Sequence, residues 1–237
     1  MTHSIAITSA KSGLGKTFIA TSLAFALAYI KNKVLFFDAS LGADNINEQL
    51  NLNLSEELPL VLANKKTLNQ IIIKNSKPSF DIISSYGGIF KLIDIPVGIT
   101  NILLDDLKII SQNYDNLIID MPSPHLINYD YSRLIILCND EPSSVSKCFE
   151  IIKNNTDKKI DIVINFAPSH LEGKRVFENI NKACQEYLKL KVNYLGTIRK
   201  DSRIKDALRN KSSIINRYPN SDASLDIFNI AKKIISQ

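Results

Sequence analysis

One stretch near the amino terminus constrains this chain more than any other. Residues 10–17 read AKSGLGKT, and they stand between a β-branched apolar run at 4–8 and a helical segment at 16–31. Gly13 and Gly15 free the backbone so that consecutive N–H groups can surround an anion, and the helix N-terminus behind them adds positive potential. A strand, a glycine-rich loop and a helix in this order predict a phosphate-binding loop. A plain strand-to-helix turn with a helix cap is the alternative.

The last residues of the loop suit a nucleotide. Lys16 would place a positive charge on the β- and γ-phosphates, and the Thr17 hydroxyl would bind Mg²⁺. We therefore expect a metal-nucleotide complex as the ligand. The expected nucleotide-binding residues of the loop are Ser12, Gly13, Leu14, Gly15, Lys16, Thr17 and Phe18.

Two further apolar runs end in aspartate. VLFFD ends at Asp38 and NLIID ends at Asp120. Ligands of open parallel sheets bind beyond the carboxyl ends of the strands, so both carboxylates would converge on the loop. Mg²⁺ keeps several waters and takes few protein ligands, which suits acids in these places beside Thr17. Either aspartate alone has a helix cap or a turn residue as its alternative, but the two together favour a metal site.

Short β-branched runs alternate with helical segments along the whole chain. Their near-continuous hydrophobicity is typical of strands that are buried on both faces of a parallel sheet. We expect a doubly wound α/β fold, with a mostly parallel sheet of about seven to eight strands flanked by helices, and a single P-loop domain over residues 1–237. The expected strands are 4–8, 33–38, 80–85, 116–120, 133–138, 161–166 and 192–196. The expected helices are 16–31, 100–113, 143–154, 172–189, 202–210 and 222–235, with a short one at 67–75.

Composition excludes several classes of protein. The chain is 45% hydrophobic and 22% charged with a net charge of +5, which permits an anionic partner without demanding one. Its 3 cysteines form no CxxC pair, so we expect neither a disulfide framework nor a thiolate metal site. This cysteine usage favours a reducing compartment, and we expect a cytoplasmic location. The most apolar helical run, 18–30, is shorter than the roughly 20 residues that span a bilayer. We expect a soluble protein.

The loop and several later segments resemble the MinD/ParA family of P-loop ATPases. Lys11, five residues before Lys16, gives the KxGxGKT form of that family's deviant Walker A motif. Within the family, the resemblance is to the flagellar-number regulators, the FlhG/FleN group. The similar segments are DASLGADNIN (38–47), DIISSYGG (81–88), DEPSSVSKCFEIIK (140–153) and YLGTIRKDSRIKDAL (194–208).

This resemblance implies a nucleotide-dependent switch. ATP or ADP would bind with Mg²⁺, and ATP would be sandwiched in a homodimer in which Lys11 reaches the phosphates of the partner subunit. Asn165 would contact the edge of the adenine, and Arg199 and Asp201 would line its pocket. A protein partner, such as a flagellar GTPase or regulator, would read the nucleotide state. The alternative for Lys11 is a solvated surface charge.

The sequence departs from the family's pattern where water would be activated. Ser40 stands two residues after Asp38, where the family carries a carboxylate that positions the attacking water. General acid–base groups contribute about 10²–10⁴-fold to a rate, so we expect slow or absent hydrolysis, with Asp44 as a possible substitute. Ser12 replaces a usual glycine and Arg199 a usual proline.

Two other functions remain open, a degenerate nucleotide-binding scaffold and a ParA-type DNA partition ATPase. The basic segment 199–211 could contact nucleic-acid phosphates, but a solvated helix face with acid–base pairs is the favoured interpretation. The amphipathic segment at 222–235 matches the family's final core helix, so core packing is favoured over lipid binding. We expect no amphipathic membrane helix after it, and weak or absent membrane contact.

Overall fold

The computed structural model describes residues 2–39, 46–50, 52, 58–74, 80–84, 97–124 and 129–236. Within them, one eight-stranded sheet has the order β3-β4-β2-β5-β1-β6-β7-β8. Every neighbouring pair is parallel except β3 and β4, which are antiparallel. The strands are β1 (His3–Ser9), β2 (Val34–Asp38), β3 (Ile73–Lys74), β4 (Asp81–Ser84), β5 (Asn116–Asp120), β6 (Arg133–Cys138), β7 (Ile160–Ala167) and β8 (Asn193–Arg199).

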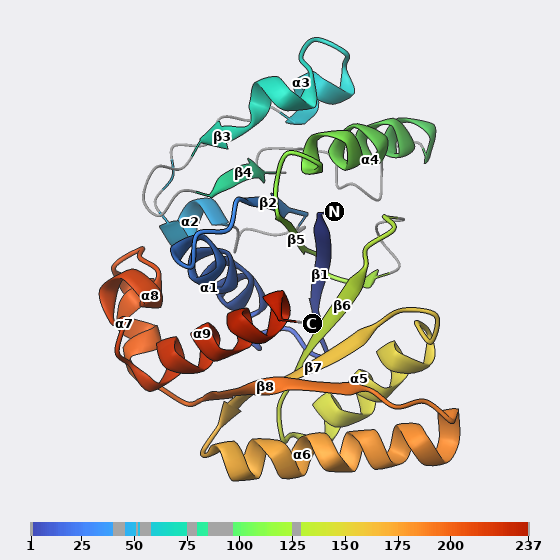
Figure 1. The fold of residues 1–237 in the computed structure, drawn as a ribbon, viewed down its shortest axis with the longest axis vertical. Coiled ribbons are helices and arrows are strands. Elements are labelled where there is room, and N and C mark those ends of the chain that lie inside the picture. The colour runs from blue at the N-terminus through green and yellow to red at the C-terminus, as the bar shows by residue number, and fades with distance from the viewer. Residues whose placement is uncertain are drawn as a thin grey trace.

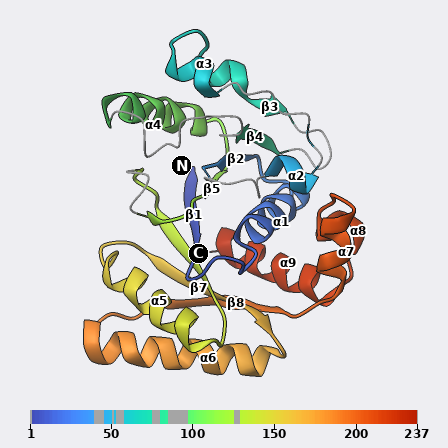
Figure 2. The same cartoon turned by 180° about the vertical axis from the view of Figure 1, so that it is seen from behind.

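Helices cover both faces of this sheet, as Figures 1 and 2 show from opposite sides. One face carries α1 and α9, and the other carries α4, α5 and α6. The helices are α1 (Lys16–Tyr29), α2 (Ile46–Leu50), α3 (Leu58–Leu62), α4 (Val97–Ser111), α5 (Pro142–Lys153), α6 (His170–Ala183), α7 (Arg203–Arg209), α8 (Ile214–Arg217) and α9 (Asp222–Ile235). A 3₁₀ turn, η1 (Leu68–Ile71), and a π-helical turn, η4 (Cys184–Leu188), complete them.

The central strands explain the apolar runs of the sequence. Every residue of β2, β5 and β6 is buried. Along β1, Ile5 and Ile7 belong to the core beneath α1 and α9, whereas Ala6 belongs to the core on the opposite face. Because successive side chains of a strand point to opposite faces, burial on both faces requires the continuous hydrophobicity that predicted a parallel sheet.

Residues 67–74, the described part of the segment 67–75, do not form the helix that the sequence predicted. Leu68–Ile71 form one 3₁₀ turn, which a capping box between Thr67 and Gln70 begins. Ile73 and Lys74 then pair with β4 as an antiparallel edge strand. The physical reason is the run of three isoleucines at 71–73, because β-branched side chains fit an extended backbone better than a helix.

The final helix packs in the core, as its apolar rows predicted. Ile227, Ile230 and Ile234 are buried on α9 against α1 and β8. The polar row of the same helix is only partly exposed, because Asp226 retains just 2% of its accessible surface. None of the described helices is long and apolar enough to cross a membrane.

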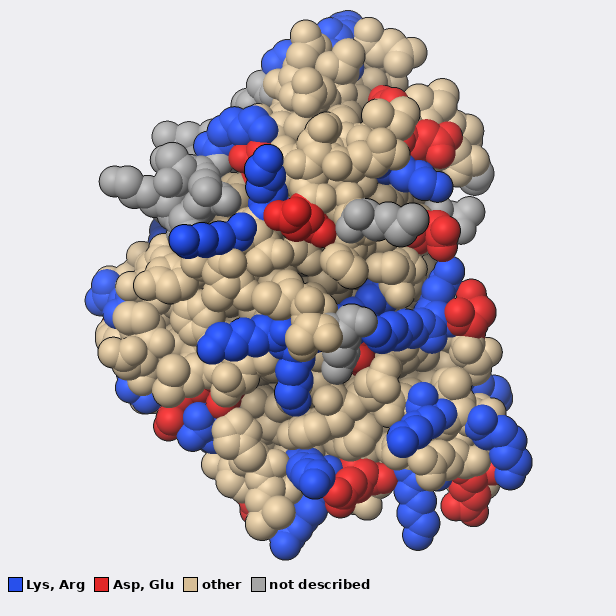
Figure 3. Space-filling model, viewed as in Figure 1, with Lys and Arg blue, Asp and Glu red and all other residues tan. Residues whose placement is uncertain are grey.

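The basic segment 199–211 carries carboxylate partners. Arg203 pairs with Asp201 at 2.8 Å, and Arg217 reaches back to Asp206 on α7 at 2.7 Å. Figure 3 shows basic side chains spread over one face of the molecule, with acidic side chains among them. This pairing is what a solvated helix face predicts.

Helix α6 approaches β8 unusually closely. A Cβ atom added to Gly173 would lie 2.1 Å from Thr197 Oγ1 and 2.6 Å from Thr197 Cγ2. Ordinary contacts of a Cβ atom are 3.4–4 Å. The side chain of Thr197 therefore occupies the space over Gly173.

Candidate phosphate-binding site

The loop between β1 and α1 has the backbone that a phosphate cradle requires. Gly13 and Gly15 have φ angles of 81° and 71°, in the left-handed region that glycine adopts without strain. Among the described residues, no atom beyond its chain neighbours lies within 4 Å of a Cβ added to Gly13, so the structure shows a conformational reason for this glycine. Gly15 is the N-cap of α1, and the loop therefore leads directly into a helix N-terminus.

Lys16 makes an ion pair below this loop. Its Nζ donates to Oδ1 of Asp120, at the end of β5. Asp120 is fully buried, and its second oxygen, Oδ2, accepts no hydrogen bond from the described residues. A buried carboxylate is stable only with charged or hydrogen-bonding partners. The unsatisfied Oδ2 atom therefore fits a site that receives a cation.

The two strand-end aspartates are neighbours. Asp38 and Asp120 are register partners on the parallel strands β2 and β5, and the N–H of Ala39 donates to the Asp120 carbonyl at 3.0 Å. Asp38 also accepts the N–H of Ile46, the first residue of α2, at 3.3 Å. This is a contact that the helix-cap alternative predicts. Thr17 is buried in the first turn of α1.

Thr17, Asp38 and Asp120 offer oxygen donors of the kind that Mg²⁺ prefers, with only two carboxylates among them. No group of three or more His, Cys, Asp or Glu that could hold a metal occurs in the described parts of the chain. The donor set fits an ion that takes most of its ligands from water and phosphate.

Lys11 lies at the surface of the loop, with 48% of its side chain exposed. Its Nζ pairs with Glu141 Oε2 at 2.5 Å, and Asn139 Nδ2 donates to the other carboxylate oxygen at 3.0 Å. The hydrogen bond from Lys11 holds the pKa of Glu141 below its ordinary value. Sequence reasoning gave Glu141 no role, although it lies in the EPSS segment on which the resemblance rests.

Asn165 ties the end of β7 to the loop. Its Nδ2 donates to the Leu14 carbonyl at 2.8 Å, and its Oδ1 accepts the Phe166 N–H at 2.9 Å. Phe166 has a left-handed φ of 58°, and its ring lies 3.9 Å from a Cβ added to Gly15. The amide of Asn165 thus holds the loop itself.

The remaining expected residues lie around this centre. Arg199 ends β8 and Asp201 follows it, and the Lys200 N–H between them donates to the Ala167 carbonyl at 2.9 Å. Ser12 is exposed, whereas Phe18 lies in α1 with its side chain buried in the core. Ser40 and Asp44 lie outside the described residues.

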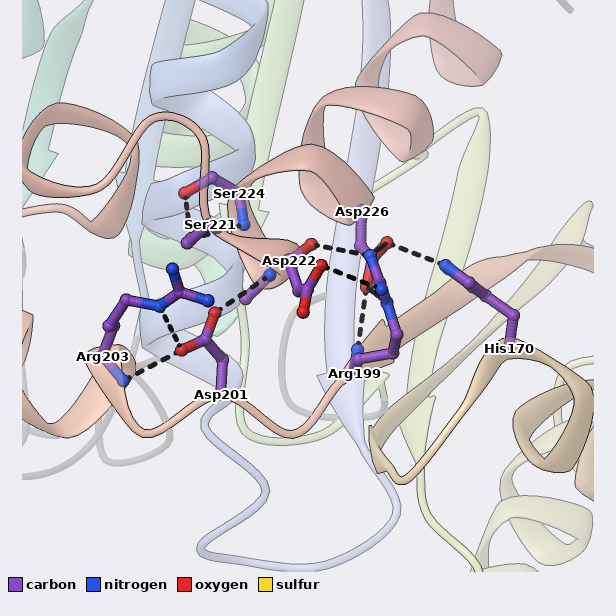
Figure 4. A network of polar contacts seen from close by, with 9 residues as sticks. His170, Arg199, Asp201, Arg203, Ser221, Asp222, Ser224 and Asp226 are labelled. Atoms are coloured by element: carbon purple, nitrogen blue, oxygen red, sulfur yellow. Dashed lines mark hydrogen bonds and ion pairs between the residues drawn. The ribbon is translucent and has the colours of Figure 1, made fainter.

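Arg199 is engaged with carboxylates of α9 (Figure 4). It bonds both oxygens of Asp226 and pairs with Asp222 at 2.9 Å. The hydrogen bond to Asp226 raises the pKa of the Arg199 guanidinium. For Asp201, burial acts to raise the pKa, but hydrogen bonds from the side chain and backbone of Arg203 outweigh it and lower the pKa. Neither Asp226 nor Asp222 was predicted, because helical periodicity marks both only as polar positions.

A central strand, a left-handed glycine loop, a helix and two strand-end acids define a P-loop nucleotide-binding protein. The family model for the CobQ/CobB/MinD/ParA nucleotide binding domain matches residues 5–214. The chain belongs to this family.

Curated relatives match over nearly the whole chain. Antiactivator FleN of Pseudomonas aeruginosa is 26% identical over 242 residues, which cover 98% of this chain and 86% of the relative. The flagellum site-determining protein YlxH of Helicobacter pylori is 26% identical over 247 residues, which cover 100% of this chain and 83% of the relative.

Solved structures show the same fold. MinD from Pyrococcus horikoshii, complexed with Mg-ADP, superposes with a TM-score of 0.80 at 20% identity, covering 99% of this chain and 96% of that chain. MinD in the MinC:MinD complex of Aquifex aeolicus gives 0.79 at 22%, with coverage of 99% and 96%. The fold is therefore the MinD/ParA P-loop NTPase fold, and its eight-stranded sheet agrees with the predicted seven to eight strands.

Proposed function

We propose that this chain is an ATP-dependent molecular switch that forms an ATP-sandwiched homodimer and regulates the number or placement of flagella. The two flagellar relatives, named for an antiactivator and for the choice of a flagellar site, support this role. The Mg-ADP in the Pyrococcus MinD structure supports nucleotide and metal as ligands.

The observation that carries the proposal is the Lys16–Asp120 ion pair beneath the left-handed loop. Lys16 is the first residue of α1, and it lies beside Asp120 at the end of β5. Asp38 ends the neighbouring strand β2. Loop N–H groups and Lys16 would bind the β- and γ-phosphates, while Thr17, Asp38 and Asp120 would hold Mg²⁺ directly or through water. The metal would supply positive charge that offsets the phosphate oxygens.

Lys11 supports the dimer. Its ammonium is exposed on the loop and needs only to leave Glu141 in order to meet an anion of a second copy. Both side chains are about half exposed, so water screens this ion pair and its exchange opposes dimerisation only weakly. Lys11 and Lys16 would then stabilise the charge that develops during hydrolysis. With Ser40 at the water-positioning place, hydrolysis is slow.

Calorimetric titration with Mg²⁺-ATP tests nucleotide binding, and light scattering with ATP or ADP tests the dimer. We expect the wild type to bind both nucleotides and to dimerise with ATP alone. Lys16→Ala should lose binding. Lys11→Ala should bind ATP but stay monomeric, and Lys31→Ala, a surface lysine away from the loop, is the matched control. Well-folded wild-type protein that takes up no nucleotide would refute the proposal.

A further inference from the structure

Asp226 on α9 is a buried carboxylate with an unusual number of donors. Its Oδ2 accepts both the backbone N–H and the Nε–H of Arg199, each at 2.9 Å, and its Oδ1 accepts the Nη2–H of Arg199, also at 2.9 Å. His170 Nε2 lies 3.1 Å from the same Oδ1. Figure 4 shows Arg199 and His170 approaching Asp226 from two different elements.

These contacts join three elements at the carboxyl end of β8. Arg199 ends β8, His170 begins α6 and Asp226 lies in α9, whose first turn also carries Asp222. Helices α6 and α9 cover opposite faces of the sheet, so Asp226 links both layers to the strand between them. Because one of the donors is the main-chain N–H of Arg199, Asp226 fixes the backbone where the chain leaves the sheet.

The turn that follows is held from the same helix. Asp201 accepts the N–H of Ala223 at 3.4 Å, from the first turn of α9. Lys200, between Arg199 and Asp201, donates its N–H to Ala167 at the end of β7. The turn 199–201 therefore lies between α9 and the β7 end, whose Asn165 holds the phosphate-binding loop.

The sheet order says which part of a nucleotide would meet this turn. The metal-binding candidates Asp38 and Asp120 end β2 and β5, on one side of β1. Asn165 lies near the end of β7 and Arg199 ends β8, on the other side of β1. If the terminal phosphates lie on the β5 side of β1, a nucleoside that extends from the opposite side of the loop would lie towards β7 and β8. The turn 199–201 lies on that path.

We propose that Asp226 is a positioning residue for the nucleoside end of the bound nucleotide. It acts through Arg199, whose backbone and guanidinium it fixes, and so sets the turn 199–201 against the β7 end. The inference rests on the proposed function. It adds a residue of α9, outside the loop and the strand ends, that governs how ATP is held.

The test compares Mg²⁺-ATP with Mg²⁺-tripolyphosphate, which has the phosphates but no nucleoside. Asp226→Asn should weaken ATP binding about tenfold, because hydrogen bonds to a charged group are lost. Tripolyphosphate affinity should change by less than about twofold, because the loop is untouched. The matched control is Asp222→Asn. It removes an exposed carboxylate of the same helix, α9, that also pairs with Arg199. It should change both affinities by less than about twofold.

A purely structural role predicts another pattern. Asp226→Asn would then lower the melting temperature, and it would leave both affinities unchanged or weaken them equally. Either result would overturn the inference. If Asp226→Asn does not fold, Arg199→Lys provides the same comparison, because lysine keeps the positive charge but lacks the paired N–H donors of the guanidinium. It should give the same selective loss, and equal loss or no loss would again overturn the inference.

A variant that combines Asp226→Asn with Arg199→Lys tests whether Asp226 acts through Arg199. When both single variants fold, the double variant should bind ATP no more weakly than the single variant with the lower ATP affinity. Full additivity would contradict the path through Arg199. Wild-type protein that binds no ATP would refute the proposed function and this inference together, whereas normal wild-type binding with an unchanged Asp226→Asn would refute this inference alone.

Discussion

Substituting Gly173 by alanine is the most direct test of how α6 sits on β8. The new Cβ would lie 2.1, 2.6 and 2.9 Å from three atoms of Thr197. The shortest of these distances is about 1.3 Å less than an ordinary contact, so helix and strand must move apart. Overpacking costs typically 1–3 kcal/mol, and we take about 3 kcal/mol for so short a contact.

Alanine favours the helical backbone over glycine by about 1 kcal/mol, which offsets part of this strain. The net loss is about 2 kcal/mol, equivalent to a melting temperature about 4–8 °C lower for a chain of this size. Circular dichroism on heating measures it. Gly98→Ala in α4 is the matched control, because no atom of the described residues beyond its chain neighbours lies within 4 Å of its added Cβ. Its melting temperature should stay level or rise.

Thr197→Ala in the same chain removes Oγ1 and Cγ2, the two atoms with the shortest contacts. The double variant should therefore be more stable than the sum of the single effects predicts, with a coupling of about 1–2 kcal/mol. A Gly173→Ala variant that melts with the wild type would refute the close approach of α6 to β8. Additivity in the double variant would show that the strain lies elsewhere.

Three further predictions concern the site and the core. Lys11→Ala should return the pKa of Glu141 towards its ordinary 4.5, which an NMR titration of the carboxyl groups would measure. Because Lys11 lowers the pKa of Glu141 in the folded protein, the stability that the ion pair adds is present above the ordinary pKa and is lost as the pH falls. A pKa of Glu141 that does not change in the variant would contradict the ion pair. Ser40→Asp should raise the single-turnover rate of ATP hydrolysis by about 10²-fold or more, and an unchanged rate would show that water positioning is not what limits hydrolysis. The three cysteines are buried, and burial raises the pKa of Cys184 to about 11. Ellman's reagent should therefore modify none of them in folded protein at pH 8 and all of them in denaturant.

Much of this fold follows from patterns that the sequence carries locally. Continuous apolar runs predicted the buried strands because burial on two faces leaves no room for alternation. The exception was the edge strand Ile73–Lys74. Its pairing with β4 depends on a neighbour that the local sequence window does not contain.

The site was predictable where a motif carries its own geometry. Gly13, Gly15 and Lys16 act within one loop, and their spacing alone indicates phosphate binding. Asp38 and Asp120 were placed together by the rule that strands of a parallel sheet end at one edge. Partners that come from distant elements, such as Glu141 and Asp226, leave no such signal. The arginine at position 199 was the one hint, since a cation beside the core needs a carboxylate.

Strand β1 lies in the middle of the sheet, although it comes first in the chain. Its two neighbours, β5 and β6, begin at Asn116 and Arg133, and the hydrogen bond from Asn165 to Leu14 spans 151 positions. During synthesis, β1 therefore leaves the ribosome before both of its neighbours and is enclosed only after β6 has emerged. Such long-range pairing folds slowly and exposes apolar surface meanwhile. A nascent chain halted before β7 emerges would carry the complete glycine motif and still lack the contact that shapes it.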